Sequence, residues 1–112
     1  MANFVPNYRE WLDQLQEEII SPEMEIIDTH HHLWRGSKEG RWSDYLLESF
    51  WTDTDSGHNI IKTVFVECRS CYWNEGPKYL SPVGETEFVS KIAEESQKSL
   101  GGHAAICAIV SY

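Results

Sequence analysis

The sequence predicts an α/β fold made of parallel strands, because strand-like and helix-like segments alternate along it. Residues 59–68 and 104–110 are short, almost continuously apolar runs rich in β-branched side chains, which is typical of strands covered on both faces. Between them, residues 83–99 carry apolar side chains at helical spacing. A strand, helix, strand order with buried-type strands is typical of a parallel sheet with right-handed crossovers.

The N-terminal half adds one helix, one strand and one long connection to this pattern. Residues 8–20 are expected to form an amphipathic helix that Ser21-Pro22 ends, because apolar residues recur among polar ones at helical spacing: Trp11, Leu12, Leu15, Ile19 and Ile20. Residues 1–24 would then be a helical lead-in outside the sheet. Residues 25–32 predict the first strand. Residues 35–57 are polar and predict a connection with a short helix among Tyr45, Leu46, Leu47, Phe50 and Trp51.

The C-terminal half predicts a strand, a helix and a last strand. Ser81-Pro82 fits the N-cap and first position of the helix over residues 83–99, and Gly101-Gly102 fits its end. The strand over residues 104–110 has no following helix to cover it, and a complete (β/α)8 barrel takes ~250 residues. We therefore expect residues 25–112 to be the first three β/α units of an incomplete TIM barrel, with this chain a fragment.

Composition excludes several classes of function. The chain has 112 residues, 41% of them hydrophobic, and its 9 basic against 18 acidic residues give a net charge of −9. This charge argues against binding to nucleic acid or to an anionic membrane surface. Neither a signal peptide nor an apolar run of ~20 residues is present, so we expect a cytoplasmic protein. Three cysteines, an odd number, fit reduced thiols: Cys68, Cys71 and Cys107.

The sequence Ile26-Ile27-Asp28-Thr29-His30-His31-His32 carries the strongest functional signal. In a strand, alternate side chains share a face, so the imidazoles of His30 and His32 would lie together, with their Cα atoms about 6.5–7 Å apart. Two nitrogens leaning together from that spacing can share one metal ion. In a helix the same side chains would diverge by about 200°. The motif therefore predicts two ligands of a metal site, with at least one more ligand elsewhere.

Three segments together resemble the amidohydrolase superfamily, in particular the amidohydrolase-related branch of TIM-barrel metal-dependent hydrolases. The run from Asp28 to Trp34 is similar to that branch's first-strand motif. The segment 63–70 (Thr-Val-Phe-Val-Glu-Cys-Arg-Ser) is similar to its second strand, and the segment 82–89 (Pro-Val-Gly-Glu-Thr-Glu-Phe-Val) to the start of its second helix. The resemblance extends from about Trp11 onward. This branch includes sugar-lactone and dicarboxylate-lactone hydrolases and some metal-dependent decarboxylases.

The resemblance implies that His30 and His32 bind a divalent metal ion, with Zn²⁺ and Mn²⁺ both compatible with such ligands. The implied activity is hydrolysis of a lactone-type or ester-type carbonyl substrate by metal-activated water. Members of the family take their remaining ligands, and the Asp that moves protons, from later strands that this sequence does not contain. The catalytic residues are therefore unknown, and we expect the 112-residue chain alone to be inactive.

For other residues near the motif, the sequence is compatible with a functional role or a structural role. Asp28 could orient an imidazole or make an ordinary structural hydrogen bond. Glu67 and Arg69 follow the second strand and could line the substrate pocket, with the forked guanidinium suited to a carboxylate, or could form a loop ion pair. Trp34 could wall the pocket, as could Tyr72 and Trp73, or these aromatics could simply pack.

The remaining histidines and the Cys-x-x-Cys motif are expected to have structural roles. His31 should point to the opposite face from its two neighbours and pack there. His58 and His103 precede strands, so we expect surface positions at the far rim. Cys68 and Cys71 form a single Cys-x-x-Cys motif, which favours buried or strand-end thiols over a zinc or redox site.

Two alternatives to the hydrolase remain open. One is a metal-dependent decarboxylase of an unsaturated or aromatic acid on the same fold. The other is a short non-catalytic chain that pairs with a partner through its open sheet edge. Homo-oligomerisation is compatible with each of these functions.

Overall fold

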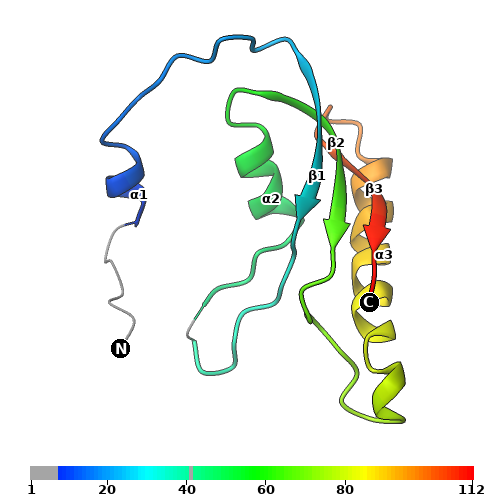
Figure 1. The fold of residues 1–112 in the computed structure, drawn as a ribbon. Coiled ribbons are helices and arrows are strands. Elements are labelled where there is room, and N and C mark those ends of the chain that lie inside the picture. Colours follow the sequence, from blue (N-terminus) through cyan, green and yellow to red (C-terminus); the bar gives the residue numbers. More distant parts are fainter. Residues whose placement is uncertain (1–7, 41) are drawn as a thin grey trace.

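A parallel sheet with three strands forms the centre of the computed structural model, which describes residues 8–40 and 42–112 (Figure 1). The strands are β1 (Glu25–His31), β2 (Asn59–Val66) and β3 (Ala105–Val110), and they lie side by side in that order. Helix α2 (Leu47–Thr54) follows β1, and a short 3₁₀ helix η1 (Lys78–Leu80) and helix α3 (Val83–Lys98) follow β2. The predicted α/β class and the parallel pairing are confirmed.

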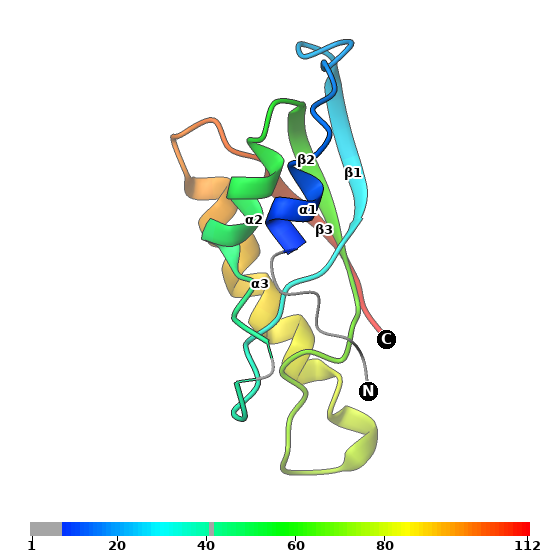
Figure 2. The same ribbon diagram turned by 90° about the vertical axis from the view of Figure 1, so that its left-hand side faces the viewer.

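One face of the sheet carries the core. Helices α2 and α3 both lie against this face, as Figure 2 shows with the strands seen nearly edge-on. The buried apolar side chains form a single cluster that joins the strands to both helices: Leu33, Leu47, Phe50, Phe65, Val89, Ala93, Ala104 and Ile106. Placing consecutive helices on the same side is the consequence of right-handed crossovers that all progress in one direction.

The opposite face of the sheet is largely open within the described residues. Ile27 on β1 is 56% exposed and Val110 on β3 is 51% exposed. Cys107 and Ala108 on β3 are exposed as well. The expectation that these apolar strands are covered on both faces is therefore wrong for this chain, because both helices pack on the same side.

The predicted N-terminal helix is much shorter in the structure. Helix α1 spans only Tyr8–Leu12, and residues 13–24 form turns and extended chain (Figure 1). A short helix is marginal in water unless its apolar stripe packs on something. Ile19 lies instead beside Gly57, where a Cβ atom would come within 2.2 Å of the Ile19 side chain. That contact favours an extended lead-in over a continued helix.

The ladder between the strands is irregular near the carboxyl end of β1. Asp28 lies opposite Thr63 and His31 lies opposite Phe65, so three steps on β1 match two on β2. The same ladder is also irregular between Ile26 and Ile27, and the ladder of β2 and β3 is irregular between Thr63 and Val64. Irregularities of this kind break the alternation of side chains and often occur beside functional sites.

The start of α3 fits closely against the loop that follows β2. The helix begins at Val83, the first residue of the predicted range, but its N-cap is Pro82, one residue later than the predicted Ser81. A Cβ atom at Gly84 would lie 2.5 Å from the Cys71 carbonyl oxygen and 2.7 Å from the Trp73 backbone nitrogen, so only glycine fits there. In the part of the chain that the structure describes, no helix is long and apolar enough to cross a membrane.

Candidate metal and substrate site

The imidazoles of His30 and His32 lie together at the carboxyl end of β1. Their ring centroids are 5.0 Å apart and the rings meet edge to face. His30 is exposed and His32 is half-buried. In parallel α/β proteins, catalytic groups gather at this end of the strands. The pair therefore provides two nitrogen donors side by side, in the geometry that the His-x-His spacing predicts.

A hydrogen bond to the neighbouring strand fixes the ring of His32. Its Nδ1 lies 2.7 Å from the carbonyl oxygen of Val66 at the end of β2. A carbonyl oxygen only accepts hydrogen bonds, so Nδ1 donates and carries the proton. In the uncharged ring with its proton on Nδ1, the other nitrogen, Nε2, has a free lone pair. Metal-bound histidines commonly donate their second ring N–H to a carbonyl or carboxylate in this way.

His31 points to the helix-covered face, as expected for a packing role. Its ring stacks on Phe50 with centroids 4.4 Å apart, and its Nε2 lies 3.1 Å from the Thr63 hydroxyl. Burial lowers the pKa of this imidazole below its usual value of 6.5. Nδ1 of His31 is buried with no hydrogen-bond partner among the described residues, which favours the uncharged ring.

Asp28 contacts the backbone in the structure. Its carboxylate accepts a hydrogen bond of 3.1 Å from the backbone N–H of His30. Asp28 therefore makes a structural hydrogen bond and does not orient an imidazole in this structure. The bond stabilises the irregular stretch between Asp28 and His31. The carboxylate thereby holds the backbone that carries the first imidazole.

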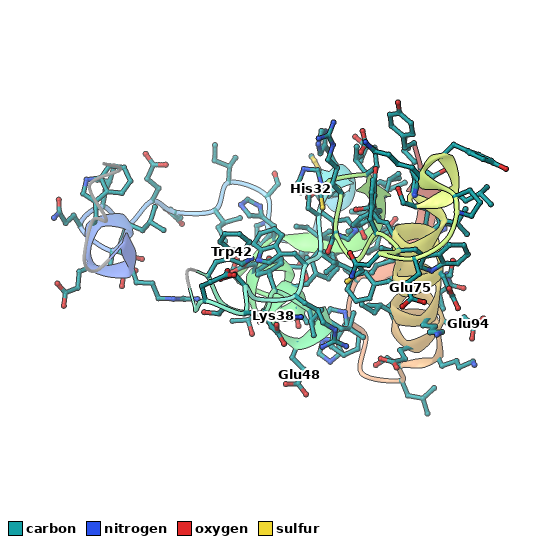
Figure 3. All side chains as sticks on the ribbon, turned by 90° about the horizontal axis from the view of Figure 1, so that it is seen from below. His32, Lys38, Trp42, Glu48, Glu75 and Glu94 are labelled. Carbon is teal, nitrogen blue, oxygen red and sulfur yellow. The ribbon has the colours of Figure 1, made fainter. Side chains whose placement is uncertain are left out.

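A cleft of about 520 Å³ opens beside His32, at the carboxyl ends of β1 and β2. Figure 3 looks along the strands from this end and labels two of the lining residues, His32 and Trp42. Trp34 and Arg69, both pocket candidates from the sequence, also line the cleft, and so do Arg35, Cys68, Ser70 and Cys71. Glu67 is half-buried and does not line it; its backbone N–H donates to the Val110 carbonyl oxygen over 2.9 Å. Cys68, Cys71 and Cys107 are all free thiols, as the sequence predicts.

The loop after β1 folds back on itself and forms one wall of the cleft. Trp34 and Tyr45 pair through their backbones and stack with ring centroids 4.9 Å apart. The Trp34 indole donates to the Ser43 carbonyl oxygen over 3.2 Å, and the Trp42 indole donates to the Arg35 carbonyl oxygen over 3.3 Å. Trp34 and Trp42 therefore pack within the loop and also line the cleft.

The loop after β2 is held by a buried carboxylate that the sequence analysis did not single out. Glu85, in the first turn of α3, is 3% exposed. Its carboxylate accepts hydrogen bonds from the backbone N–H groups of Cys68 and Ser70. Arg69 between them has φ +63° and Cys71 has φ +56°, conformations uncommon outside glycine. The available signal was an acidic residue next to Gly84, inside a segment already noted for its family resemblance.

The far end of the sheet holds the other two histidines. His58 is exposed, as predicted. His103 is only half-buried: its Nδ1 lies 2.6 Å from a carboxylate oxygen of Asp55, and its ring stacks on Trp51 at 4.3 Å. This group lies beyond the amino ends of the strands and connects the end of α2 to the start of β3, so it is remote from His30 and His32.

Within residues 8–40 and 42–112, no group of three or more His, Cys, Asp or Glu side chains is arranged to hold a metal ion. The described chain thus presents two nitrogen donors and no third ligand. No family model, no curated protein and no solved structure matches this chain.

Proposed function

We propose that this chain is the N-terminal part of a metal-dependent hydrolase of the amidohydrolase type, acting on a lactone or ester carbonyl. The observation that carries the proposal is the His30 and His32 pair at the carboxyl end of β1, with Nδ1 of His32 bonded to the Val66 carbonyl oxygen and Nε2 left to accept. Two histidines with only a structural role would not need their imidazoles on one face, nor a hydrogen bond that fixes the proton of His32 on Nδ1.

The topology supports a barrel as the complete fold. An open, doubly wound sheet reverses its strand order and carries helices on both faces. Here the order is β1-β2-β3 with helices on one face only, which is the arrangement of consecutive β/α units in a (β/α)8 barrel. The open face, with Ile27 and Val110, would then be the barrel interior, covered by strands beyond the three described.

The two imidazoles fit a divalent ion in part. His30 and His32 supply one nitrogen ligand each, which fills two coordination positions. Zn²⁺ and Mn²⁺ both accept imidazole together with carboxylate ligands. The chemistry that such an ion supplies is activation of water and polarisation of a carbonyl oxygen. Further ligands and the proton-moving group would come from later strands of the barrel.

The chain's own residues would orient the ligands and shape the substrate site. The Val66 carbonyl oxygen holds the imidazole of His32, and Asp28 holds the backbone of His30. Trp34 and Trp42 form apolar walls of the cleft, and Arg69 offers forked donors to a carboxylate group of the substrate. The ring of His31 packs on Phe50 on the helix-covered face and does not line the cleft.

Cobalt(II) titration tests the metal site without requiring activity. The absorption of Co²⁺ in the visible range changes when imidazole ligands replace water, and it can be followed on the 112-residue chain and on a longer natural product. We expect His30→Ala and His32→Ala each to weaken Co²⁺ binding by at least tenfold. His58→Ala, an exposed histidine at the opposite end of the sheet, is the matched control and should bind like the wild type. Equal binding by all four proteins would refute the metal site.

Product analysis then separates hydrolase from lyase, using the protein at the length that its cell makes. Opening of a lactone releases one proton and no gas, whereas decarboxylation releases CO₂. A full-length barrel would have a mass well above the 13.0 kDa of this chain. A natural product of that smaller mass, stable only in a complex, would favour the non-catalytic partner-binding function instead.

A further inference from the structure

A second cleft, of about 820 Å³, lies on the other side of Arg69 from the histidine cleft. Its walls come from the loop after β2, from η1 and from the segment that follows β3. It is lined by two cationic side chains, three tyrosines, a serine and a proline: Arg69, Lys78, Tyr72, Tyr79, Tyr112, Ser81 and Pro82. It lies at the carboxyl end of the sheet, as the first cleft does, and Arg69 lines both.

The charge of this cleft is opposite to that of the chain. Two cationic side chains and no Asp or Glu side chain line it, in a chain of net charge −9. Neither Arg69 nor Lys78 takes part in an ion pair within the described residues. The carboxylates of Glu67 and Glu85 act electrostatically on Tyr72, but that of Glu85 is buried and already accepts backbone N–H groups. Two unpaired cations that share a cavity favour an anionic ligand.

Hydrogen bonds fix the backbone at both cationic positions. Glu85 accepts the N–H groups on either side of Arg69, which keeps that residue at φ +63°. On the opposite wall, the Ser81 hydroxyl donates to the Lys78 carbonyl oxygen over 2.8 Å, and the Trp73 N–H donates to the Ser81 carbonyl oxygen over 3.0 Å. The two cations therefore extend from positions set before any ligand arrives, which lowers the cost of binding.

The tyrosines that line the cleft indicate that the ligand carries an aromatic ring. Tyr79, on the short helix η1, is 82% exposed and lines the cleft with Tyr72 and Tyr112. Exposed tyrosines around a cavity supply flat apolar surface for stacking and hydroxyl groups for hydrogen bonds. The same groups are enriched where proteins bind other molecules.

We infer that this second cleft binds a small aromatic oxyanion, with Arg69 and Lys78 holding the charged group and the tyrosines contacting the ring. Carboxylate and phosphate monoester share the chemistry that the forked guanidinium recognises. The inference does not depend on metal binding, because neither His30 nor His32 lines this cleft, although Arg69 lines both clefts.

Binding of benzoate and of phenyl phosphate, followed by NMR titration of the metal-free chain in EDTA, tests the inference. Benzamide, which has the same ring without the charge, is the ligand control. We expect both anions to bind at least tenfold more tightly than benzamide, and the tighter of the two identifies carboxylate or phosphate as the natural group. Equal binding of benzamide and the anions would overturn the inference.

Variants of matched charge make the test specific. Arg69→Gln and Lys78→Gln should each weaken anion binding by about tenfold, as expected for loss of a charge-assisted hydrogen bond. Lys91→Gln removes the same charge from the outer face of α3, where Lys91 pairs with Glu87 over 3.7 Å, and should leave binding unchanged. Anion binding that survives both cleft variants, or that falls equally in Lys91→Gln, contradicts the site. Unchanged binding in a His30→Ala and His32→Ala double variant keeps this result separate from the proposed metal function.

Discussion

Replacing Glu85, in the first turn of α3, by alanine is expected to destabilise the loop after β2, and with it the folded chain. The carboxylate is 3% exposed and accepts hydrogen bonds from the backbone N–H groups of Cys68 and Ser70. Without it, the buried N–H of Ser70 and the half-buried N–H of Cys68 have no partner, and the unusual conformation of Arg69 between them loses its support. The same change also leaves a cavity beside the start of α3.

The size of the effect follows from these contacts. A buried donor left without a partner costs about 1–3 kcal/mol, so two donors give about 2–6 kcal/mol for Glu85→Ala. Glu85→Gln is the matched control. One oxygen, Oε2, accepts from both N–H groups, and a glutamine carbonyl oxygen can take its place. We therefore expect Glu85→Gln to cost only about 1 kcal/mol, the difference between a charged and a neutral acceptor.

Urea denaturation followed by tryptophan fluorescence measures both variants, since the chain has five tryptophans. Equal denaturant slopes for the three proteins would show that the midpoints can be compared. A free energy of unfolding for Glu85→Ala within about 0.5 kcal/mol of the wild type, the range of ordinary surface substitutions, would refute the reasoning.

Two further substitutions test the core of the fold. Phe65→Ala removes a fully buried ring from the centre of the sheet and should cost about 3–5 kcal/mol of unfolding free energy, whereas the same change at the exposed Tyr79 should cost less than about 0.5 kcal/mol. His31→Gln tests the buried imidazole, whose pKa burial lowers below 6.5. Between that lowered pKa and 6.5 the unfolded chain binds more protons than the folded one, so stability should fall as pH drops from 7.5 through this window. His31→Gln should show a smaller loss between pH 7.5 and pH 5.5 than the wild type; equal losses in the two proteins would contradict the assignment.

Much of the fold could be predicted from the sequence because its signals are local. The β-branched run at residues 59–68 and the apolar run at 104–110 correspond to β2 and β3 within two residues. Helix α3 begins at Val83, where the Pro82 signal falls. Strand alternation also predicts that His30 and His32 lie together, and they do, although the ladder is irregular between Asp28 and His31.

Features that depend on distant contacts could not be predicted in the same way. Residues 13–20 have helical spacing, yet the chain there is extended, with Ile19 placed beside Gly57 some 38 residues later. The irregular ladder between Asp28 and His31 has no sequence signature. The sequence could therefore not decide whether Asp28 orients an imidazole or, as in the structure, binds the backbone. Glu85 looks like any first-turn acidic residue, and only the fold brings it to the loop after β2.

The central claim is that His30 and His32 bind one metal ion, with His32 coordinating through Nε2. Long-range ¹H–¹⁵N NMR of the imidazoles during a Zn²⁺ titration tests this most directly, because it distinguishes the two ring nitrogens of each histidine. We predict that His32 carries its proton on Nδ1 before zinc is added, as its 2.7 Å contact with the Val66 carbonyl oxygen requires. On titration, one nitrogen of His30 and Nε2 of His32 should shift together, while His58 and His103 stay unchanged. Shifts spread equally over all five histidines, or a proton on Nε2 of His32, would contradict the claim.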